Sequence, residues 1–369
     1  MPTELSAAAE RLGPSIAAFA EAHDQTGTFA AEGMETLRRE GLLGALVPEE
    51  LGGGGADVGD LCDFVRVLAG HCASTALAYS MHSHLVAAAV WRHRHGQGGE
   101  ALLRRVTAGA FLVSTGANDW LDSNGTLVRT DGGFRFTGDK AFASGSPKGD
   151  LLVTSGRYDE DGSGPQVVHF VIPLDTEGVR LGGDWDTLGM RATGSETVVI
   201  EDAFVADEAV TLVRARGPWH PSFSVVTILA PAIISSAYVG IAQRAAALAT
   251  ANALGRRDDP DVQYLVGELG NHLLSATAMW RVQVDIAQRI GSPPAIEDAS
   301  RAATAKTLTS RACIDTVNKA MEVAGGRAYF RASGIEKLYR DVRAAPYHPL
   351  QPKRQHRFSG RVALGLDPA

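Results

Sequence analysis

The 369-residue chain is poor in cysteine and in long basic clusters, and each shortage argues against a class of protein. Its three cysteines, Cys62, Cys72 and Cys313, form no CxxC pair, so a zinc or dithiol redox site has no spacing to support it. Such a low, odd count is typical of a reducing compartment. The two short basic clusters, at 92–95 and 353–357, are more typical of a solvated or interface face than of a nucleic-acid site.

The charge balance and the hydropathy pattern narrow the class further. The net charge is -7 and the pI is near 5.9, whereas a surface that follows phosphates needs clustered Lys and Arg, so we expect no nucleic-acid partner. The N-terminus lacks the basic start and the unbroken apolar stretch of a signal peptide. No run reaches membrane-spanning length without a charged or polar break. We therefore expect a cytoplasmic protein with no membrane partner.

The spacing of apolar residues changes twice along the chain. Before residue 110 and after residue 218 they recur every three or four positions, which predicts helices. Between these points, alternating apolar segments separated by Gly and Asp turns predict antiparallel strands. The predicted helices are 5–22, 30–40, 60–91, 225–253, 260–289, 300–324 and 335–342, and the predicted strands are 126–130, 133–137, 151–155, 167–172 and 197–200. We expect an α+β multidomain protein with a helical domain at 1–109, an antiparallel β domain at 110–218 and a helical bundle at 219–369.

Four segments, in this order, resemble motifs of the acyl-CoA dehydrogenase superfamily. They are GLLGALVPEELGGGG (41–55), FTGDKAFASGSPKGDLLVTSGR (136–157), LGMRATGSETVVIEDAFV (188–205) and the pair VAGGRAYF and IEKLYRDVR (323–343). The resemblance covers nearly the whole chain. It implies an N-terminal helical domain, a middle β domain and a C-terminal four-helix bundle, with a flavin, FAD or FMN, between the β domain and the bundle. It also implies a homo-oligomer, either a tetramer or a dimer.

The same resemblance implies which residues contact the flavin. Ser114, Thr115 and Asn118 match the strand along the pyrimidine edge of the isoalloxazine, although this chain has Ser-Thr-Gly where the family usually has Thr-Glu-Pro. Phe142 matches the aromatic side chain beside the flavin, and Ser144 matches the hydroxyl near flavin N5. A flavin site needs hydrogen-bonding groups at the ring edge and an apolar wall that excludes water.

Three further residues are candidates for contacts with the cofactor or the substrate. Glu322 stands where dehydrogenases of the family often have a Gln near the adenine of FAD. His82 and His84 lie on an apolar helix that borders the substrate pocket in the family, although a His in such a helix is more often a satisfied core residue. His93 and His95 are two positions apart and do not share a helix face, so we expect no metal site.

The carboxylate that dehydrogenases of the family use as a base is missing. It removes the proton alpha to a thioester while hydride leaves for flavin N5, and it needs a dry pocket in which its pKa can rise. Its usual position matches His348 and its alternative position matches Ala230. The spacing of Arg340-Asp341, six residues and His348 is similar to that of the sulfur- and phenol-oxidising flavin monooxygenases of the superfamily. FASG (142–145) and TGS (193–195) also resemble segments of these enzymes.

Three functions follow as hypotheses. The first is an oxygen-using flavin monooxygenase with a small-molecule substrate and a flavin reductase as partner, in which His348, with a pKa near neutrality, acts as an acid or a base. The second is an acyl-CoA or acyl-carrier-protein dehydrogenase whose base has moved. The third is a flavin-binding protein without turnover. The fold alone does not choose between them, because function belongs to the site.

Overall fold

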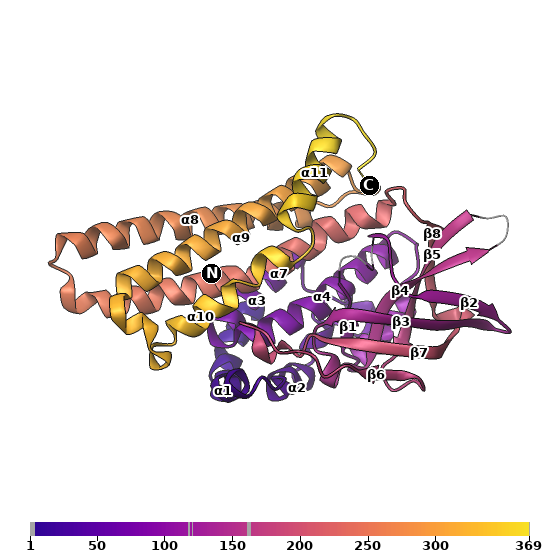
Figure 1. The fold of residues 1–369 in the computed structure, drawn as a ribbon, viewed down its shortest axis with the longest axis horizontal. Helices are drawn as coiled ribbons and strands as arrows, with labels where there is room; N and C mark the ends of the chain where they lie inside the picture. The colour runs from indigo at the N-terminus through magenta and orange to yellow at the C-terminus, as the bar shows by residue number, and fades with distance from the viewer. Residues whose placement is uncertain (1–3, 117–118, 120, 161–163, 369) are drawn as a thin grey trace.

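Two helical regions and a β-sheet make up the molecule, as Figure 1 shows. The structure, a computed structural model, describes residues 4–116, 119, 121–160 and 164–368. The sheet lies at one end, and the hairpin of helices α8 (Pro260–Gln288) and α9 (Ile296–Ala324) extends to the other. The predicted order of helical, β and helical segments is confirmed.

The helices that precede the sheet form the N-terminal region. They are α1 (Glu4–Thr26), α2 (Ala31–Arg39), α3 (Val58–His71), α4 (Ala73–Arg94) and α5 (Glu100–Thr107). The side chain of Asp57 caps α3, because it accepts a hydrogen bond from the backbone N–H of Asp60 at 2.8 Å. The prediction of one helix over 60–91 is wrong, because the extended backbone of Cys72 (φ -146, ψ 102) separates α3 from α4. Helix α5 was not among the predicted elements.

The sheet is largely antiparallel, which confirms the predicted character of the middle region. Its strands are β1 (Leu112–Ser114), β2 (Thr126–Thr130), β3 (Gly133–Ala143), β4 (Leu151–Glu160), β5 (Gly164–Pro173), β6 (Val179–Leu181), β7 (Glu196–Ala206) and β8 (Val210–Ala215). They run in the order β6-β7-β3-β2-β4-β5-β8, and β1 pairs with β4. The β1–β4 and β2–β4 pairs are parallel. Strands β3 and β7 are longer than predicted because they pair with each other along most of their length.

Helix α7 (Pro221–Ala253) is the centre of the C-terminal region. It packs against α3, α4, α8, α9 and the short α10 (Ile335–Val342), while α11 (Pro352–Ala363) packs on α9. Residues 221–256 are long and apolar enough to cross a membrane, but 89% of their most apolar window is buried inside the protein, which a core helix also explains. Gly240 allows α7 to approach α3 closely, because a Cβ atom there would lie 2.1 Å from the carbonyl oxygen of Arg66.

The described residues form two hydrophobic cores. The larger core joins residues of the N-terminal helices, such as Tyr79, to residues of the C-terminal helices, such as Ile233 and Trp280. The smaller core fills the β region and includes Phe136 and Phe170, whose rings are 5.2 Å apart. The helices before residue 110 therefore share one core with those after residue 218. The division at 109 and 218 stays a prediction.

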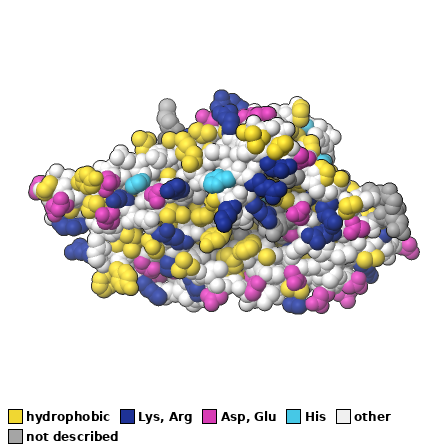
Figure 2. Space-filling view, turned by 45° about the horizontal axis from the view of Figure 1, so that its top comes forward, with side chains coloured by type: hydrophobic (Ala, Val, Ile, Leu, Met, Phe, Trp, Pro, Cys, Tyr) yellow, Lys and Arg dark blue, Asp and Glu magenta, His cyan; other side chains and the backbone are white. Residues whose placement is uncertain are grey.

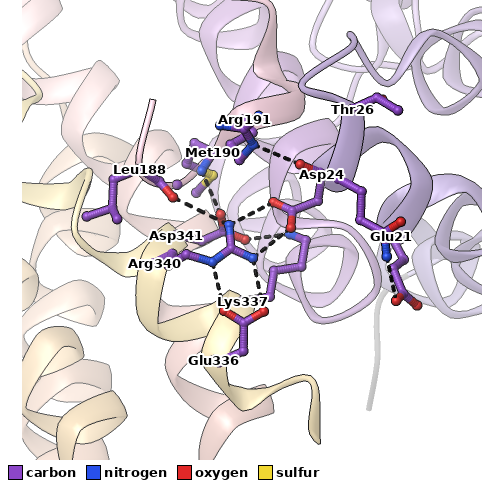
Figure 3. Close-up of polar contacts among 12 residues, drawn as sticks. Glu21, Asp24, Thr26, Leu188, Met190, Arg191, Glu336, Lys337, Arg340 and Asp341 are labelled. Atoms are coloured by element: carbon purple, nitrogen blue, oxygen red, sulfur yellow. Dashed lines mark hydrogen bonds and ion pairs between the residues drawn. The ribbon is translucent and has the colours of Figure 1, made fainter. Parts of the chain in front are cut away.

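A cluster of polar contacts, which we call the α10 node, connects α10 to the loop between β6 and β7 (Figure 3). The buried carboxylate of Asp341 accepts hydrogen bonds from the backbone N–H of Met190 and from Lys337 Nζ, both at 2.6 Å. Burial by itself would lower the pKa of Lys337, but the adjacent Asp341 carboxylate raises it above the ordinary value. Gly189 fits against this node, because a Cβ atom there would lie 2.2 Å from the carbonyl oxygen of Arg340.

The same node reaches the N-terminal region through Arg340. Its guanidinium group donates to Asp24 at 2.7 Å and to Glu336 at 2.8 Å, and these bonds raise its pKa. Arg191 donates to the carbonyl oxygen of Asp24 at 2.8 Å, so α1, α10 and the loop before β7 meet at one point (Figure 3). Arg340 and Asp341 thus bind different partners: Arg340 binds Asp24, and Asp341 binds the backbone N–H of Met190.

Candidate active site

A cavity of about 600 Å³ lies where the β-sheet meets the helical regions. Its walls come from α4, the segment after β1, the end of β3, the loop before β7, α7 and the segment 340–351. Much of the lining is apolar and includes Met81, Trp185, Leu188, Phe223, Val226 and Ile234. A cavity of this size, apolar with a few polar groups, is typical of sites for cofactors and small molecules.

Most of the residues predicted for the site line this cavity. They are Ser114, Thr115, Phe142, Ser144, His84 and His348. Asn118 lies outside the described residues. His82 and Glu322 are not among the described residues that line the cavity.

Two buried polar atoms in the cavity wall have no hydrogen-bond partner among the described residues. They are the hydroxyl oxygen of Ser114 and the side-chain carbonyl oxygen of Gln351. Leaving such a group without a partner costs about 1–3 kcal/mol, so both atoms are suited to bind a polar molecule in the cavity. The edge of an isoalloxazine ring carries both donors and acceptors. The residues present therefore fit a flavin.

Phe142 stands at the cavity in an unusual backbone conformation. Its φ is 60°, in the left-handed region that a bulky side chain rarely adopts, and its side chain is 60% exposed. Its ring meets Trp185 edge to face, with 6.4 Å between the ring centroids. Such strain is common at ligand sites, where the surrounding structure holds a side chain in place. An exposed aromatic face at the cavity suits stacking on a planar ligand.

Ser144 begins a row of three hydroxyl groups in the cavity wall, which we call the hydroxyl chain. Its Oγ lies 2.7 Å from Ser195 Oγ, and Ser195 Oγ lies 2.8 Å from Thr193 Oγ1. Thr193 Oγ1 is in turn 2.9 Å from the carbonyl oxygen of Met190. All three hydroxyl groups are buried and belong to residues that line the cavity. The sequence shows Ser144 and the TGS motif (193–195) as separate features and does not reveal their contact.

His82 uses both ring nitrogens to connect elements of the protein. Its Nε2 lies 2.9 Å from the carbonyl oxygen of Leu43, and its Nδ1 accepts from the backbone N–H of Leu112 at 2.9 Å. Because a carbonyl only accepts and an N–H only donates, the ring is neutral with its proton on Nε2. Burial lowers its pKa to about 4. The structure therefore places His82 as a buried link between α4, the 42–44 turn and β1.

His84 has one ring nitrogen left for a ligand. Its Nδ1 is 3.3 Å from the carbonyl oxygen of Ser80, one turn earlier in α4, so Nδ1 carries the proton. No described residue is bonded to Nε2, and His84 lines the cavity. Burial lowers the pKa of His84 to about 4, so the ring is neutral at pH 7. Its Nε2 is therefore a hydrogen-bond acceptor available to a molecule in the cavity.

In His348 the engaged ring nitrogen is Nε2 and the free one is Nδ1, the reverse of His84. Its Nε2 lies 2.5 Å from the hydroxyl of Tyr238, and its pKa is lowered to about 3 by burial and by Lys306 and His84. The near-neutral pKa expected from the sequence is therefore wrong. Tyr238 is buried, and His348 is the one hydrogen-bond partner that the described residues give its hydroxyl, so the hydroxyl donates to Nε2. The proton of the neutral ring is then on Nδ1, which no described residue binds and which is free to donate to a ligand.

Lys306 on α9 fixes the backbone that carries His348. Its ammonium group lies 2.7 Å from the carbonyl oxygen of His348, 3.4 Å from that of Leu350 and 3.5 Å from that of Pro346. No acidic side chain pairs with it among the described residues, and burial lowers its pKa to about 7. Neither Lys306 nor Tyr238 was found from the sequence, because each is a single polar residue in a helix far from His348 in the chain.

The cavity offers no unpaired carboxylate among the residues that the structure describes. Ala230, at the alternative position of the dehydrogenase base, lines the cavity on α7. Asp119 is the acidic residue in the described lining, and the buried Lys140 donates to it at 3.1 Å. Lys140 also donates to the carbonyl oxygen of Ser155 at 2.6 Å, and burial lowers its pKa to about 8. Asp119 is thus part of a buried ion pair, which the sequence did not reveal.

Glu322 lies on the exposed side of α9, away from the lining of the cavity. Its carboxylate accepts from Lys319 at 2.6 Å, and Lys319 also binds Glu268 of α8 at 2.8 Å. These contacts connect two bundle helices. A role of Glu322 at the adenine of FAD stays a prediction.

Comparison with known proteins connects this geometry to a family. Residues 6–110 match the family model described as "Acyl-CoA dehydrogenase, N-terminal domain", and residues 232–351 match "Acyl-CoA dehydrogenase, C-terminal domain". The chain is 32% identical to L-evernosamine nitrososynthase of a Micromonospora species, over 96% of this chain and 88% of the relative. It is 29% identical to dibenzothiophene monooxygenase of Mycolicibacterium goodii, over 88% of this chain and 85% of the relative.

A solved structure has a similar fold over nearly its whole length. KijD3, in complex with FMN and dTDP-3-amino-2,3,6-trideoxy-4-keto-3-methyl-D-glucose, superposes with a TM-score of 0.88 at 28% identity. The match covers 99% of this chain and 95% of KijD3.

Proposed function

Because this chain belongs to the acyl-CoA dehydrogenase superfamily, we propose that it is a flavin-dependent oxidoreductase of the monooxygenase type. The observation that carries the proposal is the cavity, which has two neutral imidazoles and no unpaired carboxylate among its described lining residues. The relatives that are nitrososynthases or monooxygenases support the same conclusion.

The dehydrogenase alternative needs a base that the cavity does not offer. Dehydrogenases of the family remove the proton alpha to a thioester with a carboxylate, and the free nitrogen of His84 is a weak base for that step because burial lowers its pKa to about 4. Ala230 and His348 stand at the two positions of that base, and Asp119 is bonded by Lys140. A flavin-binding protein without turnover has no need of two differently protonated imidazoles at the cavity.

The groups in the cavity have separate tasks in the proposed reaction. Reduced flavin supplies two electrons to O2, so that one oxygen atom enters the substrate and the other leaves as water. The hydroxyl of Ser114 and the amide of Gln351 bind the cofactor, and the apolar walls exclude water. His84 Nε2 accepts a hydrogen bond from the substrate, while His348 Nδ1–H donates one.

FMN fits this proposal better than FAD. KijD3 was solved with FMN, and Probable FMNH2-dependent monooxygenase SfnC of Pseudomonas putida is 26% identical over 98% of this chain. Use of reduced FMN also implies a separate flavin reductase as a partner that supplies it.

Exposed aromatic and aliphatic side chains on the helical half support a homo-oligomer. Tyr264, Leu274, Tyr329 and Phe330 are each more than 60% exposed, and Figure 2 shows hydrophobic side chains set among charged ones over one face. Such side chains gain stability when a second copy covers them. We propose a tetramer or a dimer located in the cytoplasm, and light scattering of the purified protein checks the oligomeric state.

An activity screen tests the proposed reaction. The protein is incubated with FMN, NADH and a flavin reductase under isotopically labelled oxygen, together with small amines, thioethers, phenols and aromatic heterocycles. We expect at least one product to carry a single labelled oxygen atom. Anaerobic reduction of bound flavin by acyl thioesters, without oxygen transfer in the screen, would contradict the proposal and favour the dehydrogenase.

A further inference from the structure

The hydrogen bonds of the hydroxyl chain have one fixed direction. The carbonyl oxygen of Met190, at the end of the hydroxyl chain, sets it. The carbonyl oxygen of Met190 only accepts, so Thr193 donates its single hydroxyl proton to it at 2.9 Å. Thr193 Oγ1 then accepts from Ser195 at 2.8 Å. Because the proton of Ser195 is engaged in that bond, Ser195 Oγ accepts from Ser144 at 2.7 Å. The protons therefore run from Ser144 towards Met190.

This direction leaves Ser144 with an acceptor and no donor for a ligand. Its hydroxyl proton is held by Ser195, while Oγ keeps a lone pair. The backbone N–H of Ser144 donates to the carbonyl oxygen of Phe142 at 3.0 Å, and the N–H of Gly145 donates to that of Thr193 at 2.9 Å. The Ser144 hydroxyl and these two N–H groups are therefore engaged within the protein. A ligand atom that meets Ser144 gains a hydrogen bond only if it carries a proton.

The two redox states of a flavin differ at the atom expected beside Ser144. N5 of the reduced ring carries a proton and donates, whereas N5 of the oxidised ring has only a lone pair and accepts. We propose that the hydroxyl chain makes the site selective for reduced over oxidised flavin, with Ser195 and Thr193 as the residues that set this preference through Ser144. The inference rests on the proposed function, because it requires a flavin in the cavity.

The loop that carries the end of the hydroxyl chain is itself held in place. Thr193 and Met190 belong to the loop that the α10 node holds, since the N–H of Met190 binds the buried carboxylate of Asp341. The Met190 carbonyl, at the end of the hydroxyl chain, is therefore held in place by the α10 node. With this acceptor fixed, Ser144 can donate to an oxidised flavin only by giving up its hydrogen bond to Ser195.

Flavin titrations of wild type and variants test the preference. Dissociation constants are measured for oxidised FMN and, under anaerobic conditions, for reduced FMN, and their ratio is compared. Ser195→Ala frees the proton of Ser144 to donate to oxidised N5, so we expect the preference for reduced FMN to fall by about fivefold, the size of one net hydrogen bond. Thr193→Val removes the hydroxyl at the fixed end of the hydroxyl chain, so it should also lower the preference for reduced FMN.

Two control variants separate this effect from a general disturbance of the wall. Ser195→Thr keeps a hydroxyl and should keep the wild-type ratio. Thr227 lines the cavity on α7 but does not belong to the hydroxyl chain. Thr227→Val removes its hydroxyl and should also keep the ratio. An unchanged ratio in both Ser195→Ala and Thr193→Val, with tight binding of both flavins, would overturn this inference alone. Wild-type protein that binds neither flavin would overturn the proposed function as well.

Discussion

Three histidines show how their neighbours give one side chain different functions. His82 has both nitrogens engaged by backbone groups, His84 keeps a free acceptor, and His348 keeps a free donor. The sequence could predict that these residues lie near a pocket. It could not predict which nitrogen is engaged, because the partners of His82 and His348 are 30 to 110 positions away in the chain.

At the residue scale, the two cavity histidines are expected to matter for turnover and not for flavin binding. His84→Gln and His348→Gln should each lower kcat by about a hundredfold or more, the size of a positioned proton-transfer or hydrogen-bonding group. The dissociation constant of reduced FMN should change little. Measurement of kcat with the substrate found in the screen checks the first expectation, and anaerobic titration with reduced FMN checks the second. Equal losses of binding and turnover would contradict the assigned roles.

His82 should behave as a structural residue. His82→Ala leaves the carbonyl of Leu43 and the N–H of Leu112 buried without partners, so the free energy of unfolding should fall by about 2–5 kcal/mol. His84→Ala breaks a single hydrogen bond of 3.3 Å and should cost less. Urea unfolding of the two variants provides the comparison. A larger loss in His84→Ala would contradict the account.

At the scale of elements, side chains from distant helices hold the segments that shape the cavity. Asp341 on α10 fixes the loop before β7, and Lys306 on α9 fixes the segment of His348. The Arg-Asp motif located α10 correctly from the sequence. The bond between Asp341 and Met190 was not predictable, because the two residues are 151 positions apart in the chain.

The α10 node should couple stability to flavin binding. Asp341→Ala removes the partner of the Met190 N–H and of the Lys337 ammonium group, so it should lower the free energy of unfolding by about 3–5 kcal/mol and weaken FMN binding. Glu336→Ala removes the two hydrogen bonds that Arg340 donates to Glu336 while the bonds to Asp24 remain, so it serves as the control and should cost about 1 kcal/mol. Chemical unfolding and FMN titration measure both effects, and equal effects of the two variants would contradict the node's role.

At the scale of the molecule, the order of helical and β regions was predictable from the period of apolar residues alone. Helix 335–342 and strand 126–130 have the predicted ends, and β3 is longer because long-range pairing with β7 extends it. Hydrophobic periodicity does not reveal that the first and last regions share one core, since it describes each helix separately. The break at Cys72 was missed because apolar and small residues continue across it.

Buried neutral histidines should make the whole molecule sensitive to acid. Burial lowers the pKa of His82 and His84 to about 4 and that of His169 and His348 to about 3. Between pH 6.5 and these values the unfolded chain takes up protons that the folded chain does not, so stability falls as pH falls. At pH 5 each contributes a loss of about 2 kcal/mol.

Thermal unfolding at several pH values tests this dependence. The midpoint should drop steeply between pH 7 and pH 5, and His84→Gln should make the decrease shallower because one titrating group is gone. A midpoint that stays constant over this range would show that the folded protein takes up these protons as readily as the unfolded chain.

The central claim is that a flavin binds where the β-sheet meets the helices, against Ser114, Phe142 and Ser144. A crystal structure of the protein with FMN tests it most directly. The account predicts an isoalloxazine in the 600 Å³ cavity, with its pyrimidine edge at Ser114 and its N5 at Ser144. Flavin bound elsewhere, or a cavity without flavin at saturating FMN, would contradict it.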